Sequence, residues 1–135
     1  VNLTQTLTIK SKPKALLVHL KRFTFHMHHG EMISRKSETL VKSENAVSLE
    51  PFTEMAAKGG DDTYKLIGVA HHIGPSADSG HYTADALRKE DNGDGREWVK
   101  FDDSSTSKTS IEIQEKPEQL LSALWNIKYL CQSQN

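Results

Sequence analysis

The sequence has 135 residues, of which 36% are hydrophobic and 26% are charged, and its formal net charge is -1. This length suits one domain with a core of its own, and the near-neutral charge argues against a nucleic-acid partner. Because no run of about eighteen apolar residues occurs, we expect no membrane span. The single cysteine, Cys131, rules out an internal disulfide framework and suits a reducing intracellular compartment, the cytoplasm or the nucleus.

The first half of the chain shows few clear strand patterns. Residues 4–9 alternate weakly and predict an edge strand. Residues 15–23 are apolar on both faces in their first half, as a central strand would be. The polar segment 24–44, rich in His, Lys and Ser, predicts a long mobile loop, poorly ordered over 26–39. Residues 47–55 predict a short irregular piece around a proline.

The second half predicts most of a sheet. Residues 64–72 and 81–87 read as a hairpin with a long glycine-containing tip, and 98–101 as a third strand after a turn with two Asx-Gly dipeptides. The remaining expectations are a Ser/Thr-rich loop at 104–110, a short strand at 110–114, a short Pro-initiated helix at 117–124 and a last strand at 127–131. The sum is an α+β fold with a mainly antiparallel sheet.

Two motifs carry candidate chemistry: Gly-His-Tyr-Thr-Ala at 80–84 and Trp-Val-Lys-Phe-Asp-Asp-Ser at 98–104. A thiol protease needs a thiolate, an imidazole beside it and a polar group that orients the imidazole. Neighbouring antiparallel strands can place His81 beside Asp102, whose carboxylate would accept the ring N–H and select the tautomer. Gly80 has no side chain, so a substrate backbone could pass close to the reacting atoms.

Asp103 has a different expected position from Asp102. Successive side chains of an extended chain alternate, so Asp103 points away unless the strand breaks there. It could orient a water or a donor near a developing oxyanion. Each motif alone also has an ordinary explanation, since a lone histidine is often structural and Asp-Asp-Ser is a common loop opening.

Four segments resemble, in the same order, motifs of the ubiquitin-specific proteases, and the resemblance runs from about Thr8 to the C-terminus. They are Ala-Leu-Leu-Val-His-Leu-Lys-Arg-Phe at 15–23, Tyr-Lys-Leu-Ile-Gly-Val-Ala-His-His-Ile-Gly at 64–74, and the two motifs at 80–84 and 98–104. The family implies a papain-like fold with finger, palm and thumb regions. Residues 1–135 would then be the palm-bearing C-terminal part of the catalytic domain.

By this resemblance, His81 matches the catalytic histidine, Asp102 the residue that orients it, and Asp103 a second acidic residue. Gly80 and Tyr82 match positions that line the narrow channel for the ubiquitin tail, and His72 is a further substrate-binding candidate. The segments 26–39 and 73–79 correspond to two loops that cover this channel.

The implied activity is thiol-dependent hydrolysis of the isopeptide bond after the C-terminal glycine of ubiquitin, with no cofactor. The expected partners are ubiquitin, ubiquitinated proteins and the N-terminal part of the same domain. The family's cysteine box is upstream of the histidine and is absent from these 135 residues, so we expect this chain alone to be inactive. The alternative is a non-catalytic ubiquitin-binding homologue or scaffold.

Two other assignments are weaker. Cys131 follows the histidine, whereas the family's nucleophile precedes it, and a cysteine on a terminal apolar strand is usually a small buried hydrophobe. The histidine clusters at 26–29 and 71–72 suggest metal ligands, but adjacent histidines of an extended segment point to opposite faces. We therefore predict no metal site. The paired Cys-x-x-Cys zinc ligands found in many family members are also absent from this sequence.

Overall fold

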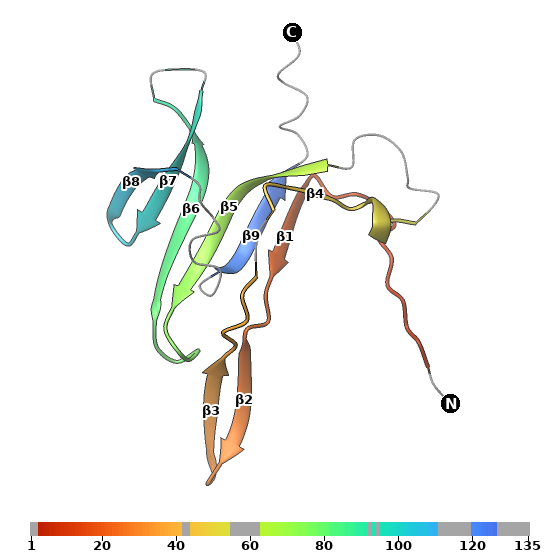
Figure 1. Ribbon diagram of the computed structural model, residues 1–135, viewed down its shortest axis with the longest axis vertical. Coiled ribbons are helices and arrows are strands. Elements are labelled where there is room, and N and C mark those ends of the chain that lie inside the picture. The colour runs from red at the N-terminus through yellow and green to blue at the C-terminus, as the bar shows by residue number, and fades with distance from the viewer. Residues whose placement is uncertain are drawn as a thin grey trace. The chain divides into compact units, whose positions relative to one another are not determined.

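The computed structural model describes residues 3–41, 44–54, 63–91, 93 and 95–110, and the backbone of 120–126. In these ranges the larger sheet has the strand order β1-β9-β5-β6-β7-β8, with β4 also paired to β5, and β2 and β3 form a separate hairpin (Figure 1). The strands are β1 (Ala15–His19), β2 (Phe23–His28), β3 (Glu31–Lys36), β4 (Ala46–Ser48), β5 (Thr63–Ile73), β6 (His81–Lys89), β7 (Arg96–Asp102), β8 (Ser105–Thr109) and β9 (Leu120–Asn126).

Every strand pair whose register is defined is antiparallel, which confirms the predicted mainly antiparallel sheet. The helical content of the described residues is a 3-10 turn at Glu50–Phe52. No helix in these ranges is long and apolar enough to cross a membrane. The chain divides into two compact units, and the candidate site residues all belong to the second, 17–43 with 67–124.

The first unit, which includes 44–66, is built around the start of β5. Tyr64 is fully buried and its hydroxyl donates to the carbonyl of Pro13 at 2.6 Å, and Leu49 and Leu66 are also buried. Burial raises the pKa of the Tyr64 hydroxyl. The predicted edge strand at 4–9 is wrong: only Ile9 makes a bridge, to Thr53. Leu7 within that segment and Leu3 just before it are more than 80% exposed, so no apolar face holds the segment to a sheet.

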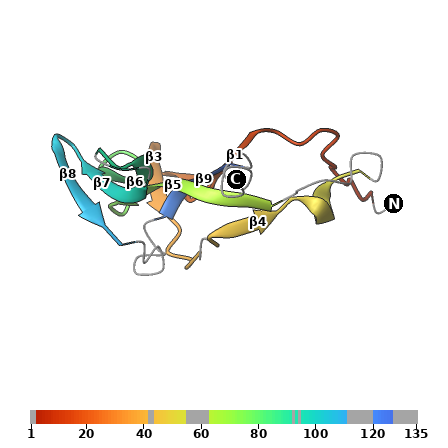
Figure 2. The same ribbon diagram turned by 90° about the horizontal axis from the view of Figure 1, so that it is seen from above.

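The second unit contains the ladder β5-β6-β7-β8 (Figure 2). All three strands predicted here are confirmed, and each extends slightly beyond its expected bounds. The register of β5 and β6 runs from Gly68↔Ala86 to Ile73↔His81, so the connecting loop spans 74–80 as expected. Burial on both faces of β5, at Val69, His71 and His72, explains why its sequence reads as a nearly continuous apolar run.

Three expectations for other parts of the sheet are wrong. The Ser/Thr-rich segment after β7 is a strand, because its alternating threonines and serines pair with β7 from Trp98↔Thr109 to Asp102↔Ser105. The expected helix is instead β9 from Leu120 onward, since pairing between β1 and β5 outweighs the helical leucine spacing. Strand β1 stands at the end of the strand order and not at its centre. The strand expected at 110–114 lies outside the described residues except for Ser110, which is not in a strand, and the strand expected at 127–131, with Cys131, lies wholly outside them.

The loop predicted at 24–44 is wrong over 24–36, which form two strands and a turn, whereas its mobility stays a prediction. Strands β2 and β3 pair from Phe23↔Lys36 to His28↔Glu31. The turn residues His29 and Gly30 have φ of 51° and 85°, which is the conformation of a two-residue type I′ hairpin turn. His-Gly is a weaker sequence signal for this turn than Asn-Gly, and the strands are polar, so the periodicity did not reveal the hairpin.

The β2–β3 hairpin is tied to the loop 74–80 by several hydrogen bonds. The Ser34 hydroxyl donates to Asp78 Oδ2 at 2.5 Å and accepts from the N–H of Ala77 at 3.0 Å. The Lys36 N–H donates to the Pro75 carbonyl at 2.9 Å, and the Lys36 ammonium donates to the carbonyl of His72. The loop before His81 is therefore held in place by residues of the hairpin, which are distant from it in sequence.

We predict that Ser34→Ala loosens this loop. The N–H of Ala77 loses its acceptor, and a lost buried hydrogen bond costs about 1 kcal/mol. Hydrogen exchange should speed up at the amides of 75–80, whereas Ser107→Ala, on an exposed position of β8, should leave them unchanged. Equal protection of the loop in both variants would show that the Ser34 contacts do not hold it.

Candidate active site

His81 and Asp102 meet at the edge of the sheet where β6 begins and β7 ends. The register pairs Ala84 with Phe101, so one further step faces Asp102 with Thr83 and makes His81 its diagonal neighbour on the same face. Side chains of this length reach across such a diagonal. His81 Nε2 and Asp102 Oδ1 lie 2.5 Å apart, which is the contact that the sequence predicts.

The hydrogen bond shifts both groups toward their charged forms. It raises the pKa of His81, against a lowering contribution from desolvation, and it lowers the pKa of the Asp102 carboxyl. The side chains are 42% and 40% exposed, so solvent screens the pair and its effect on stability is small. When Nε2 donates to Asp102, Nδ1 is the ring nitrogen that can exchange a proton with another group.

Asp103 lies closer to this pair than an extended chain allows. Its φ is 51°, so the strand breaks directly after Asp102 and a turn begins. One ring nitrogen of His81 and one carboxylate oxygen each of Asp102 and Asp103 all lie within 4.8 Å of one another. The strand break that is the exception to this alternation thus occurs, and the left-handed backbone of Asp103 turns its carboxylate back toward the pair. We assign no metal to this cluster, since two of its three donors already bond to each other.

Gly80 is required by both its backbone and its surroundings. Its φ is +154°, a conformation that residues with a side chain rarely adopt. A Cβ here would lie 2.3 Å from His72 Nε2 and 2.7 Å from the carbonyl oxygen of Ile73. The chain thus enters β6 with its backbone packed directly on the His72 ring.

His72 and Tyr82 occupy different environments. The His72 ring is fully buried, with centroids 5.1 Å from Phe23 and 4.8 Å from Tyr82, and among the described residues neither ring nitrogen has a hydrogen-bond partner. Burial and the nearby Lys36 lower its pKa, although a backbone group of Ser79 acts in the other direction. His72 therefore offers no surface to a ligand in this structure and supports Gly80 instead, whereas Tyr82 is 55% exposed.

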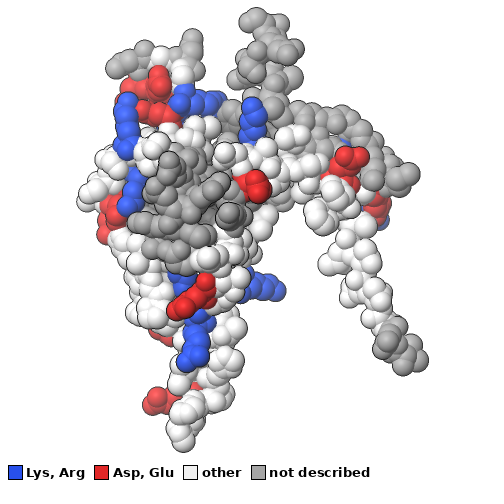
Figure 3. All heavy atoms as spheres, viewed as in Figure 1, with Lys and Arg blue, Asp and Glu red and all other residues white. Residues whose placement is uncertain are grey.

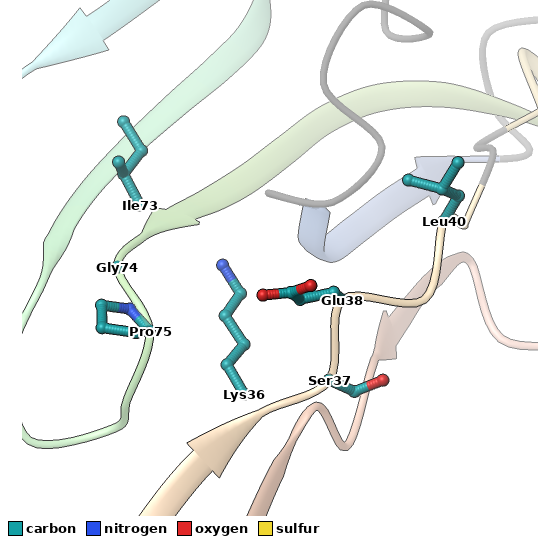
Figure 4. Close-up of a pocket in the computed structure, with 7 residues that line it drawn as sticks. All are labelled: Lys36, Ser37, Glu38, Leu40, Ile73, Gly74 and Pro75. Atoms are coloured by element: carbon teal, nitrogen blue, oxygen red, sulfur yellow. The ribbon is translucent and has the colours of Figure 1, made fainter.

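A pocket of about 440 Å³ lies between the end of the hairpin and the start of the loop 74–80 (Figure 4). Its lining comes from two segments: Lys36, Ser37, Glu38 and Leu40 on one side and Ile73, Gly74 and Pro75 on the other. Neither His81 nor Asp102 lines it. The pocket therefore lies where the two expected covering loops meet, and it is separate from the His81–Asp102 pair.

The structure adds charged residues that the motifs did not reveal. Lys100 Nζ lies 3.5 Å from Asp102 Oδ2, and a second histidine–carboxylate pair joins His71 Nε2 to Asp85 Oδ2 at 3.0 Å. The spacing of Lys100 and Asp102, two residues apart on one strand, is the signal that could have placed them on one face. Acidic and basic side chains are interspersed among the described residues on the face that Figure 3 shows.

Comparison with known proteins gives one consistent result. The family model for ubiquitin carboxyl-terminal hydrolase matches residues 3–126. The chain is 34% identical over 113 residues to ubiquitin carboxyl-terminal hydrolase 10-B of Xenopus laevis, covering 78% of this chain and 13% of that protein. It is 35% identical over 112 residues to a probable ubiquitin carboxyl-terminal hydrolase 16 of Schizosaccharomyces pombe, covering 83% and 22%.

Solved structures agree with this. The Ubp8-Sgf11-Sgf73-Sus1 SAGA DUB module matches with a TM-score of 0.65 and 28% identity, covering 88% of this chain and 25% of the other. A SAGA Ubp8/Sgf11/Sus1/Sgf73 module bound to ubiquitin aldehyde matches with a TM-score of 0.63 and 28% identity, covering 84% and 24%. The fold is thus the palm half of the papain-like cysteine protease fold, as predicted, and the chain spans a quarter or less of the relatives it matches.

The motif order, the mainly antiparallel palm sheet and a family match over nearly the whole sequence agree. The chain belongs to the ubiquitin carboxyl-terminal hydrolase family.

Proposed function

We propose that this chain provides the histidine and the acid of a deubiquitinating cysteine protease. The observation that carries the proposal is the hydrogen bond between His81 Nε2 and Asp102 Oδ1, which leaves Nδ1 for a thiol. The nucleophile would come from an N-terminal part of the same catalytic domain, outside these 135 residues. The chain by itself would then be inactive.

The proposed reaction is cleavage of the isopeptide bond after the C-terminal glycine of ubiquitin. The thiolate attacks the glycine carbonyl, and His81 as imidazolium protonates the leaving lysine amine, which breaks the C–N bond. His81, now neutral, takes a proton from water, whose oxygen attacks the thioester and releases ubiquitin and the thiol. Asp102 keeps the ring oriented through both steps and stabilises its charged form.

The segments around His81 support ubiquitin as the proposed substrate. The backbone at Gly80 and the exposed Tyr82 would border the channel for the ubiquitin tail, with Asp103 near the reacting atoms. The hairpin and the loop 74–80 would cover that channel as one tied unit. Ubiquitin as partner is supported by related modules solved with ubiquitin aldehyde and with monoubiquitin.

The alternative is a non-catalytic ubiquitin-binding scaffold. A binding role requires neither an oriented imidazole nor a carboxylate hydrogen-bonded to it, and the described site has both. We therefore favour the enzyme.

We predict that Asp102→Ala in the full-length protein lowers turnover of a fluorogenic ubiquitin C-terminal amide by roughly 10²-fold or more, the usual contribution of positioned acid–base groups. The melting temperature should change little because the pair is exposed. Asp91→Ala, an exposed acid in the turn after β6, is the matched control. Unchanged turnover in Asp102→Ala would remove the support for the dyad.

A second prediction concerns protonation. Asp102 raises the pKa of His81 above its ordinary 6.5. The protonated ring therefore adds to the stability of the fold. This contribution is fully present below about pH 6.5 and is lost as the pH rises through the raised pKa. The matching contribution of Asp102, whose pKa is lowered from 3.8, is lost as the pH falls through that lowered value. An NMR titration of the His81 ring should show a lower pKa in Asp102→Asn than in the parent. An identical pKa in both would contradict the contact.

A third prediction compares Gly30, which has open space around it, with Gly80, which is packed against the His72 ring. Gly30→Ala adds a Cβ into open space at φ +85°, so it should cost about 1–2 kcal/mol through the left-handed backbone alone. Gly80→Ala is strained at φ +154°, a backbone region used almost only by glycine, and it also drives a Cβ into the His72 ring and the Ile73 carbonyl. Chemical denaturation should therefore show a larger loss for Gly80→Ala, with turnover lost as well. Equal losses would mean that the chain entering β6 has room to move.

A further inference from the structure

Lys100 and His81 approach the same carboxylate from two sides. Lys100 and Asp102 are two residues apart on β7 and so share a face, with Nζ 3.5 Å from Oδ2. The other oxygen, Oδ1, is bonded to His81 Nε2. Each oxygen of Asp102 therefore has its own cationic or cation-forming partner.

The two contacts together restrict a torsion that is otherwise soft. The terminal torsion of an aspartate is broad, so one hydrogen bond leaves the carboxylate free to rock about it. A positive group near the second oxygen selects the orientation in which the first oxygen faces the imidazole. At the end of a strand, where the ladder no longer constrains the backbone on both sides, such a restraint has the greatest effect.

Lys100 itself sits within an ordered row of charges on this face. The register places it opposite Asp85 on β6 and opposite Ser107 on β8. Asp85 is bonded to His71 of β5. The side chains of Lys100 and Asp102 are about 40% exposed, so their attraction adds little to folding stability. The consequence of the contact is therefore local to the dyad.

We propose that Lys100 is a positioning residue of the active site, whose ammonium holds the second oxygen of Asp102 and keeps the first directed at His81. This inference rests on the proposed function, because it concerns the same dyad. The positive charge of Lys100 also has an electrostatic effect: it lowers the pKa of His81 and the pKa of Asp102. A His81 imidazolium with a less elevated pKa is a stronger acid toward the leaving amine.

The test is an NMR titration of the His81 ring, together with the ¹H signal of its Nε2 proton, in the full-length protein and three variants. Lys100→Met removes the charge and keeps the length of the side chain, and Lys100→Arg restores a cation. Lys108→Met removes the same charge from β8, where Lys108 is paired with Glu97 instead. Besides the dyad, the titratable groups on or beside the face of Lys100 are His71 of β5, Asp85 and Lys89 of β6, Arg96 of β7, and Asp103, and all of them stay unchanged.

Two opposing effects act on the His81 pKa in Lys100→Met: the lost positive charge raises it, and a loosened hydrogen bond to Asp102 lowers it. The positioning role is therefore read from the Nε2 proton itself. We expect its downfield ¹H signal to move upfield or broaden in Lys100→Met, to return in Lys100→Arg and to stay unchanged in Lys108→Met. The difference between Lys100→Met and the parent should shrink at high salt, because the contact is exposed. In the full-length protein, Lys100→Met should lower kcat with little change in KM, and Lys100→Arg should restore it.

The inference is overturned if Lys100→Met leaves the signal of the His81 Nε2 proton unchanged, or if Lys108→Met shifts it equally, since the effect would then be one of net charge. An amide spectrum of each variant shows whether it is folded, and Lys100→Arg keeps the test valid if Lys100→Met is not. The titration needs no turnover, so it can fail while the proposed enzyme activity holds, and it can succeed if that activity is absent.

Discussion

The hydrogen bond between His81 and Asp102 depends on the register of β6 and β7. A slip of one residue would turn either side chain to the opposite face and separate the pair. The pairs from Ala84↔Phe101 to Lys89↔Arg96 fix the register along the length of both strands. The chemistry at the sheet edge is thus determined by strand pairing that extends well away from it.

The start of β6 is fixed by contacts from residues distant in sequence. The bare backbone of Gly80 rests on the buried His72 ring, and the loop before it is held by Ser34 and Lys36 of the hairpin. These contacts prepare the position of His81 before any substrate arrives. Such advance ordering reduces the reorganisation that a reaction would otherwise require. The β2–β3 hairpin, a segment predicted to be a loop, thereby supports the candidate active site.

The sequence predicted the parts of the structure with strong local patterns. The apolar run of β5 and the Gly-His-Tyr and Asp-Asp-Ser motifs were sufficient to place His81 beside Asp102. The sequence did not predict the β2–β3 hairpin, β8 or β9. Polar or leucine-rich segments become strands only when a partner strand is available, and strand pairing cannot be read from local sequence. The return of Asp103 depends on one left-handed residue, which an alternation rule cannot foresee.

The most direct measurement of the central claim is the tautomer of the neutral His81 ring, read from its two ¹⁵N chemical shifts at a pH above its pKa. A His81 ring that donates to Asp102 Oδ1 carries its proton on Nε2 and leaves Nδ1 unprotonated and available to a thiol. A ring that carries its proton on Nδ1, with Nε2 unprotonated beside the carboxylate, would contradict this hydrogen bond.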